Sequence, residues 1–463
     1  MTWTWRDSGL LAAGAVGRLV DAQRVKRWYF DRVASGNAGA GGGAAATLLA
    51  MARARSPLRD AAGAGGAGAP PAPVEVMKAE ERKALLLQQL AGHLKGTTDT
   101  WMSIMVASWV LWIDATVMAM IYLGDQLGLY KQMASRGSTW TASRLAKAAG
   151  GLQARLVQEW LAQQAAAGLV DFDPKKGTFS LSSACVPLLA EPLSGSFFAP
   201  YATLMLACWK RIPTMMDAFR GQCLAPSYDE AGEDLADAMA RLHVPEVKFN
   251  FIPKVLPLIQ DGSLLQRLNS ENLLCADVGA SGADCTMEMA LQFPKATFHA
   301  YEVADPALDR ARENVKRRGL QNLKIIDAKI HPLGKAISSG QVKQRYDFVM
   351  CYDVLHDLAH PEQLIEEVRE VLAPGGVWVI VDIASNGEMA ENVRNHQKAA
   401  TYYGISVCVC LPSGLSADGG RGLGTLGFPP EVAEPMFRGN GFSKIRSFQM
   451  PSLEKNQVYE VQI

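Results

Sequence analysis

The chain lacks an excess of charge of either sign. Its 463 residues include 46 Lys and Arg and 46 Asp and Glu, which gives a formal net charge of +0 at pH 7. Proteins that attract nucleic acid through electrostatics carry a basic surplus, and solvating acidic tails carry the opposite one. The balance supports neither class, and we expect no nucleic-acid partner.

Cysteine is also scarce. The chain has 8 cysteines and no C-x-x-C pair, which excludes a disulfide scaffold, a zinc ribbon and a thioredoxin-like redox motif. So few thiols indicate a reducing compartment, and we expect the cytoplasm. Apolar material is abundant, because hydrophobic residues make up 49% of the chain and charged residues 20%. This composition allows a sizeable core and excludes global disorder.

At roughly 100–200 residues per domain, the length predicts two or three domains. We expect residues 1–95 to be a flexible extension, because Gly and Ala dominate residues 35–73. The same extension is rich in Arg and poor in acids, as organelle transit peptides are. Three Asp residues within the first 31 positions argue against targeting, but the sequence leaves both interpretations open.

Residues 101–124 form an apolar run that is long enough to span a bilayer and is interrupted by one charge, Asp114. A charge near the middle of a span is disfavoured in a membrane. We therefore predict a buried helix of an α-helical domain or a dimer interface, and no membrane partner. Because so apolar a helix is not left in water, we also expect a homodimer.

Residues 124–182 predict a winged helix. The pattern gives a helix, a turn, a second helix from Thr141, a Gly-Gly turn and a longer helix through Ala167. A two-stranded hairpin follows, with DPKKG as its turn. We assign residues 97–195 to this winged-helix and dimerisation domain.

The longer helix of the winged-helix domain is expected to bury one apolar stripe, which consists of Leu152, Leu156, Trp160 and Leu161. DNA recognition requires basic side chains on the exposed face of such a helix. The helix offers Arg155, but Glu159 offsets its charge. We therefore favour a structural or dimerising role over DNA binding.

The rest of the chain predicts an α/β fold. Residues 196–265 are expected to be mainly helical and to form a cap and connector. In residues 266–463, seven apolar runs alternate with other segments, most of them long enough for a helix: LLCADV, ATFHAYEV, LKIIDA, YDFVMCYD, VWVIVDI, FSKIRSFQM and VYEVQI. Such runs are typical of buried parallel strands. The fold class is therefore a Rossmann-like, seven-stranded doubly wound sheet, preceded by the α-helical winged-helix domain.

The strand ends of this predicted sheet carry glycines and acids. A ligand of an open α/β sheet lies beyond the carboxyl ends of the strands. After the first strand, Gly279 and Gly282 allow a sharp turn and a close approach to a ligand. The second strand ends at Glu302, which is placed to accept hydrogen bonds from ribose hydroxyls. The third ends at Asp327 and Ala328, where an acid can accept the adenine amine, so the three ends together favour a nucleoside.

A nicotinamide dinucleotide is the competing ligand. Its usual loop, G-x-G-x-x-G, has a third glycine, which GASGAD lacks. Asp277 and Asp284 would repel its phosphates, whereas acids suit a cofactor with a cationic amino group and a sulfonium. This charge argument selects S-adenosylmethionine as the cofactor.

The motifs LLCADVGASGAD, YEVAD and YDFVMCYDVLHDLAHPEQLIEEVREVLAPGGVWVIVDI resemble the motif series of class I S-adenosylmethionine-dependent methyltransferases. The APGG turn at residues 373–376 is especially typical of them. Segments such as GDQLGLY, TFSLS and GNGFSKIRSF are similar to a subgroup that carries an N-terminal winged-helix domain. The resemblance covers residues 97–463.

The resemblance implies which residues hold the methionine end of the cofactor, namely Asp277, Gly279, Ser281 and Gly282. The family's usual Cys-Gly in this loop is replaced here by Ala280 and Ser281. A serine still donates a hydrogen bond, but its Cβ occupies space that a glycine leaves open.

The resemblance also implies the residues around the nucleoside and the methyl group. Glu302 would hold the ribose, and Asp327 with Ala328 would hold the adenine. Cys351, at the end of the fourth strand, would line the methyl-transfer side.

Methyl transfer is an in-line displacement at a sulfonium, in which the protein positions the partners and removes a proton from the acceptor. His356 lies just past the fourth strand and is the candidate catalytic base, because His titrates near neutral pH. The alternative is a structural role, in which His356 caps the following helix or bonds to the backbone.

The subgroup would build its substrate pocket around Tyr402, Tyr403, Cys408 and Cys410. The two cysteines would share one face of a strand. Two thiolates without further ligands make a poor metal site, so we predict that they line the pocket and that the protein has no metal site.

The sequence thus predicts a methyltransferase that transfers a methyl group from S-adenosylmethionine to a small-molecule acceptor. Two alternatives stay open. One is a winged-helix transcription regulator with a metabolite-sensing Rossmann-like domain, and the other is a non-catalytic methyltransferase-like protein that still binds the cofactor. The sequence does not identify the acceptor.

Overall fold

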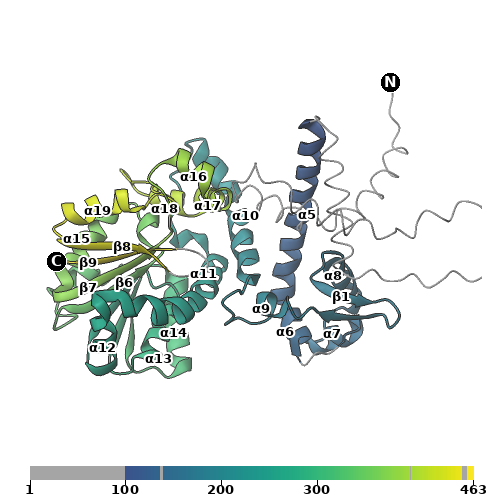
Figure 1. Ribbon diagram of the computed structural model, residues 1–463, viewed down its shortest axis with the longest axis horizontal. Helices are drawn as coiled ribbons and strands as arrows, with labels where there is room; N and C mark the ends of the chain where they lie inside the picture. The colour runs from purple at the N-terminus through teal and green to yellow at the C-terminus, as the bar shows by residue number, and fades with distance from the viewer. Residues whose placement is uncertain (1–99, 136–138, 397, 451–455) are drawn as a thin grey trace, which may run out of the picture. The chain divides into compact units, whose positions relative to one another are not determined.

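The computed structural model describes residues 100–135, 139–396, 398–450 and 456–463. The chain divides into two compact units, Met1–Val186 and Pro187–Ile463, and Figure 1 labels their elements. The predicted extension at residues 1–95 lies outside the described residues. The domain boundaries proposed from the sequence stay predictions.

The first unit contains the winged helix. Its elements are α5 (Thr100–Gln126), α6 (Leu129–Ala134), α7 (Ala142–Ala148), α8 (Ala154–Ala166), β1 (Val170–Asp173) and β2 (Thr178–Leu181). The Thr141 side chain accepts a hydrogen bond from Arg144 N and caps α7. In the turn of the antiparallel hairpin, Asp173 Oδ1 accepts hydrogen bonds from the backbone N–H groups of Lys175 and Lys176. The predicted order of helices and hairpin is confirmed.

The buried stripe of α8 differs from the predicted one. The side chains that α8 buries are Val157, Trp160, Leu161 and Gln164. Leu156 is 69% exposed, so its assignment to the stripe was wrong. With 3.6 residues per turn, Leu156 lies about 100° around the helix from Val157, away from this face. The Trp160 indole donates a hydrogen bond to the Met120 carbonyl and fixes α8 against α5.

The predicted apolar helix at residues 101–124 is present as α5, and the burial of its side chains is described for Trp112 and for residues 114–126. Val117 and Ile121 are buried, whereas Trp112 is 61% exposed and Leu123 is 39% exposed. Whether these exposed side chains are covered in a dimer interface, as the sequence suggested, stays a prediction. In the described part of the chain, no helix combines the length and the apolar character that crossing a membrane requires.

The second unit begins with helices, as the sequence predicts. After α9 (Val186–Leu189), these are α10 (Ala199–Phe219), η2 (Asp229–Ala231), α11 (Glu233–Glu246), η3 (Val247–Val255), η4 (Leu256–Gly262) and α12 (Ser263–Ser270). The Arg211 guanidinium donates hydrogen bonds to the carbonyls of Pro226 and Ser227. It thereby anchors the chain between α10 and α11, which leads into the site described below.

The seven-stranded sheet is the core of the second unit. Its strands are β3 (Leu274–Val278), β4 (Thr297–Glu302), β5 (Leu323–Asp327), β6 (Tyr346–Tyr352), β7 (Leu372–Asp382), β8 (Lys444–Gln449) and β9 (Gln457–Gln462). Their spatial order is β5-β4-β3-β6-β7-β9-β8. The strands from β5 to β7 pair in parallel, and β9 pairs antiparallel with β7 and β8. The predicted doubly wound α/β class and all seven strands are confirmed.

Helices cover both faces of this sheet. One face carries α12, α13 (Asp284–Gln292) and α14 (Asp305–Arg318), and the other carries α15 (Pro361–Val371) and α19 (Pro430–Gly439) (Figure 1). Two clusters of buried apolar side chains correspond to the two faces. The strand order reverses between β4 and β6, on either side of β3, and a reversal of this kind places ligands outside the carboxyl ends of the adjoining strands.

At the predicted APGG turn, residues 373–376, the pairing of β7 with β6 is interrupted. Leu372 pairs with Tyr346, and the pairing resumes with Val377 opposite Phe348, so the four residues form an irregularity before the continuous part of the strand. One local prediction needs correction. The segment with Cys408 and Cys410 is not a strand. It forms α17 (Ala399–Cys408) and α18 (Cys410–Gly414), which pack their cysteines with residues of α10 and α11. Tertiary packing here overrides the strand preference of a β-branched, aromatic run.

Candidate active site

The loop after β3 has a strained backbone. Gly279 has φ 74°, and a Cβ on it would lie 2.6 Å from Val354 Cγ2, so no other residue fits without a shift. Ser281 and Ala283 also have positive φ, 50° and 55°. This conformation costs free energy in residues other than glycine, and strained residues of this kind are often found at ligand-binding sites.

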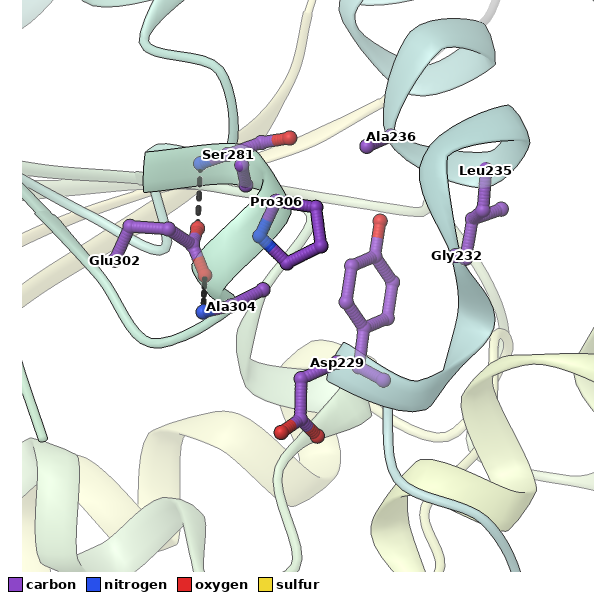
Figure 2. A pocket seen from close by; sticks show the side chains of 10 residues that line it. Asp229, Gly232, Leu235, Ala236, Ser281, Glu302, Ala304 and Pro306 are labelled. Atoms are coloured by element: carbon purple, nitrogen blue, oxygen red, sulfur yellow. Dashed lines mark hydrogen bonds between the residues drawn. The ribbon is translucent and has the colours of Figure 1, made fainter. Parts of the chain in front are cut away.

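Glu302 holds this loop. Its Oε2 accepts a hydrogen bond from Ser281 N at 2.6 Å, and its Oε1 accepts from Val303 N at 2.7 Å and Ala304 N at 2.8 Å. Figure 2 shows the carboxylate between Ser281 and Ala304. A carboxylate has about four acceptor positions, so one remains for a ligand. The sequence predicted a ligand contact here but not the anchoring of the loop.

A pocket opens beside this carboxylate. It contains about 330 Å³ of space, part of it open to solvent. Its lining comes from the η2–α11 segment, the loop after β3, the end of β4 and the start of α14. The lining residues are Tyr228, Asp229, Gly232, Leu235, Ala236, Ser281, Glu302, Ala304, Pro306 and Ala307. In Figure 2, Ser281, Glu302 and Pro306 face Gly232 and Leu235 of the helical segment. Two of the predicted cofactor residues, Ser281 and Glu302, therefore line one pocket.

Asp277 lies at the end of β3 and is buried. Burial raises the pKa of its carboxyl to about 6, although the Thr286 hydroxyl donates a hydrogen bond to Oδ2 at 2.5 Å and opposes the shift. The charge of Glu302 adds to the raised pKa. A cationic ligand group beside Asp277 would favour the ionised form.

His243 and Asp353 form a pair that the sequence reasoning missed. His243 Nε2 of α11 lies 2.8 Å from Asp353 Oδ2, and the His243 ring packs on Tyr352 at 4.9 Å between centroids. Asp353 directly follows β6 and has φ 53°. The logic that selected Glu302, an acid at a strand's carboxyl end, also applies to Asp353. No pattern marks His243.

The charge argument from Asp284 is weaker than the sequence suggested. Arg310 Nη2 lies 3.4 Å from Asp284 Oδ2, and Arg310 Nη1 lies 3.1 Å from Asp237 Oδ1. A Cβ on Gly282 would lie 2.8 Å from Asp284 Oδ2 and 3.1 Å from Arg310 Nε. Because Arg310 offsets the negative charge of Asp284, repulsion of a phosphate here depends on Asp277 and Glu302.

The remaining predicted cofactor residues lie outside the pocket lining. Asp327 pairs in register with Glu302, and its Oδ1 accepts a hydrogen bond from Lys329 N. Ala328 N donates to the Glu302 carbonyl, which places both residues next to the pocket. Cys351, by contrast, is buried in the core beneath the sheet and accepts a hydrogen bond from the Trp378 indole at 3.4 Å. The structure places Cys351 in the core instead of on the predicted methyl-transfer side.

Another set of candidate site residues surrounds His356, and we call it the His356 group. His356 lies on η6 (Leu355–Asp357) and is 3% exposed. His356 Nδ1 lies 2.7 Å from Asp382 Oδ1 at the end of β7, and Nε2 lies 3.4 Å from Asp357 Oδ1. Burial lowers the pKa of His356, but the charges of Asp382 and Asp357 outweigh it and raise that pKa well above its usual value. An acidic oxygen therefore lies near each ring nitrogen of His356. The catalytic and the structural role of His356 both stay predictions.

Tyr228 connects the pocket with the His356 group. Burial raises the pKa of its phenol well above the usual value, and the charges of Asp357 and Glu302 raise it further. Tyr228 also lines the pocket. The charges of Glu302, the candidate ribose-binding residue, and of Asp357, next to the candidate base His356, therefore both act on the Tyr228 phenol.

The predicted pocket residues of the 399–414 segment separate into two groups. Cys410 approaches His356 and Asp357, whereas Cys408 shares a hydrogen bond with Cys208 of α10. Tyr402 packs its ring on His396, at 5.5 Å between centroids, and Tyr403 is half-buried on α17. Of these four, only Cys410 joins the candidate catalytic group.

Comparison with protein families now adds to this geometry. Residues 269–429 match the model of a methyltransferase domain family, and residues 115–190 match the model of an Rv2258c-like winged helix–turn–helix domain family. The chain carries a methyltransferase domain. It also carries a winged-helix domain N-terminal to it.

Solved structures show the same fold. An O-methyltransferase family protein from Burkholderia thailandensis superposes with a TM-score of 0.55 at 16% identity, over 77% of this chain and 97% of that one. Human N-acetylserotonin methyltransferase, solved in complex with SAM, gives 0.54 at 12% identity, over 79% and 99%. At these identities the likeness concerns the fold.

A curated relative matches part of the chain. The highly reducing polyketide synthase bet1 of Neocamarosporium betae is 25% identical over 197 residues, which is 41% of this chain and 6% of the synthase. The chain therefore spans only a small part of this relative's length. The predicted family and fold class agree with the family models and the solved structures, and the S-adenosylmethionine cofactor agrees with the methyltransferase-domain match. The roles of individual site residues stay predictions.

Proposed function

We propose that the protein transfers the methyl group of S-adenosylmethionine to a hydroxyl of a small-molecule acceptor. The observation that carries the proposal is the placement of an acid-rich pocket at the carboxyl edge of β3 and β4 in the same unit as the His356 group. Tyr228 lies within electrostatic reach of both. The methyltransferase-domain match supports the reaction class.

The residues present fit this cofactor. Ser281 Oγ and Asp353 Oδ1 are buried, and no group among the described residues forms a hydrogen bond with either atom. Buried polar atoms of this kind call for a partner, and a ligand with amino, carboxylate and hydroxyl groups offers several. Asp277 and Asp353 supply negative charge for a cationic amino group and a sulfonium. When bound, S-adenosylmethionine supplies the electrophilic methyl group.

His356, in its neutral form, would remove the proton from the acceptor hydroxyl, and because its pKa is raised well above the usual value this form is favoured only at high pH. An alcohol or phenol needs such a base, since the neutral hydroxyl is a weak nucleophile. Asp382 holds the imidazole through Nδ1 and stabilises the imidazolium that forms, as an acid does in a catalytic triad. The similar protein from Burkholderia thailandensis belongs to an O-methyltransferase family, which supports oxygen as the acceptor atom.

Isothermal titration with S-adenosylmethionine tests the cofactor directly. We expect the parent protein to bind and Glu302→Ala to lose affinity at least tenfold, because its loop loses three hydrogen bonds to a charged acceptor. Glu313→Ala is the matched control, since Glu313 is exposed on α14. Absence of binding by the folded parent, or equal binding by Glu302→Ala, contradicts the proposal.

A DNA-binding role for the winged helix receives less support. The single basic residue of α8, Arg155, pairs with Glu159 at 2.5 Å, so the helix presents little net charge to phosphates. We propose a structural role instead. A gel shift that appears at low salt and weakens steeply as salt rises would overturn this assignment.

We propose that α5 mediates a homodimer. Residues 101–124 contain one charged side chain, Asp114, and Leu123 on the helix is 39% exposed. Light scattering should therefore give twice the chain mass of 50.0 kDa. A soluble particle of the single-chain mass contradicts the dimer.

A further inference from the structure

Three different ligand types meet at the His356 group. One ligand atom each of His356, Asp357 and Cys410 lies within 4.8 Å of the other two. Two come from η6 and the third from the start of α18, more than 50 residues later in the chain. The sequence-based prediction of no metal site considered only Cys408 with Cys410, whereas the folded chain pairs Cys408 with Cys208 and brings Cys410 to a histidine and a carboxylate.

The distance between His356 and Asp357 fits two ligands of a tetrahedral ion better than a hydrogen bond. His356 Nε2 and Asp357 Oδ1 lie 3.4 Å apart, beyond the roughly 2.7–3.2 Å of an N–H···O bond. An ion with bonds of about 2.0–2.2 Å to nitrogen and oxygen at a tetrahedral angle separates the two atoms by roughly 3.3–3.5 Å. No hydrogen bond from the described residues reaches Asp357 Oδ1, which is buried. The oxygen therefore has a lone pair available in the cluster.

The proposed ligands His356 and Cys410 are themselves held by hydrogen bonds with neighbouring groups, as metal ligands in proteins usually are. Asp382 Oδ1, 2.7 Å from His356 Nδ1, favours the tautomer with the proton on Nδ1 and the lone pair on Nε2. Ile383 N also donates to Asp382 Oδ1 and fixes this carboxylate. On the other side, Thr425 Oγ1 donates a hydrogen bond to Cys410 Sγ at 2.9 Å. A carboxylate–histidine pair and a hydrogen-bonded sulfur are the usual supports of protein zinc ligands.

From these contacts we infer that His356 Nε2, Asp357 Oδ1 and Cys410 Sγ form a Zn²⁺ site with three protein ligands. Nitrogen, oxygen and sulfur together suit a borderline-soft ion and disfavour Mg²⁺ and Ca²⁺, which require oxygen ligands. Three protein ligands leave the fourth tetrahedral position for water or a ligand. The inference is independent of the proposed methyl transfer, because it concerns metal binding alone.

Occupation of this site affects the proposed reaction in one direction. The ion takes the Nε2 lone pair that His356 would use to accept the proton of the acceptor. Zn²⁺ should therefore inhibit methyl transfer, and a chelator should restore it.

Co²⁺ titration of the tag-free, chelator-treated full chain tests the site without any activity measurement. We expect one Co²⁺ per chain, a sulfur-to-cobalt charge-transfer band, and loss of that band when Zn²⁺ is added. The Cys410→Ser variant should lose the band. Cys408→Ser is the matched control and should keep it, because Cys408 lies on the other side of the α17–α18 junction.

Two further variants guard against misfolding as the explanation. Asp357→Asn keeps the size of the side chain and should weaken Co²⁺ binding at least tenfold. Asp382→Asn, which alters only the support of His356, should weaken it by roughly 10–100-fold. Circular dichroism checks that each variant is folded. Sub-stoichiometric binding by the parent, or a band that survives in Cys410→Ser, would overturn the inference.

Discussion

The carboxylates at the two ends of the candidate site, the pocket and the His356 group, differ in their hydrogen bonds. At the pocket, Glu302 accepts three backbone hydrogen bonds from its own loop and the loop after β3. Around His356, Asp357 and Asp382 each retain one buried oxygen without a hydrogen bond from the described residues. The backbone thus preforms the loop around Glu302, although Asp353 nearby also retains one such oxygen. The His356 end is built from side chains and depends on proton or ion occupancy.

The largest expected effect sharpens the role of the His356 end. His356→Gln removes the proposed base but keeps a polar side chain of similar reach, so kcat should fall by about 10²–10⁴-fold. The affinity for S-adenosylmethionine should stay within a few fold, because the pocket does not include His356. Steady-state kinetics with a methyl acceptor and cofactor titration separate the two quantities. A loss of cofactor affinity as large as the loss of kcat would show that the two ends are not distinct.

The second prediction tests the preformed loop. Gly279→Ala forces a Cβ to 2.6 Å from Val354 Cγ2 at φ 74°, and should lower the free energy of unfolding by about 1–3 kcal/mol. Adding Val354→Ala should recover the steric part and leave the part due to φ. Urea denaturation of the two variants measures both. If the double variant is no more stable than Gly279→Ala, the contact with Val354 does not constrain the loop.

The third prediction concerns pH at the cofactor end. The pKa of Asp277 is raised to about 6 by burial, so the carboxylate becomes protonated as pH falls and loses its attraction for the cationic amino group. Between pH 7.5 and 5.5 the affinity for S-adenosylmethionine should fall about fourfold. Asp277→Asn should bind more weakly and lack this dependence.

Stability should change in the opposite sense. Because the folded pKa of Asp277 lies above its unfolded value near 3.8, the folded chain binds the additional proton, and its contribution to stability is lost as pH rises from about 4 to 6. The difference in unfolding free energy between the parent and Asp277→Asn, measured across this range, checks the sign. A parent that gains stability relative to Asp277→Asn as pH rises contradicts the raised pKa.

The smallest effect is expected at Ser281. Its positive φ of 50° costs about 1 kcal/mol or more, and glycine at the same position costs about 0.5–1 kcal/mol in backbone entropy. Ser281→Gly should therefore change the unfolding free energy by less than about 1 kcal/mol. A much larger change in denaturation would show that the serine side chain supports the loop of the ligand-free protein.

The sequence predicted the positions of the residues at the cofactor end better than those around His356, for a physical reason. Near-continuous apolar runs indicate the strands, and the carboxyl ends of parallel strands meet at one edge, so Asp277 and Glu302 could be placed at that edge. Their roles in cofactor binding stay predictions. The same rule applies to Asp353, whose place after β6 was visible in the sequence.

The misses arose where distant segments pack together. His243 reaches the site from α11 and Cys410 from α18, and no local pattern reports where these helices dock. Cys351 lies on the face of β6 that packs against α15 and α19, where it contacts Trp378, and a motif position does not specify this packing. Leu156 and Val157 are adjacent in the sequence, so only the packing of α8 decides which of the two is buried.

The central claim is that the acids at the carboxyl edge of β3, β4 and β6 select a cationic sulfur nucleoside over a diphosphate. A titration of the folded protein with S-adenosylmethionine and, separately, with NAD tests this claim most directly. The account predicts saturable heat with one S-adenosylmethionine per chain and none with NAD at the same concentrations. Saturable binding of NAD, with none of S-adenosylmethionine, would contradict it.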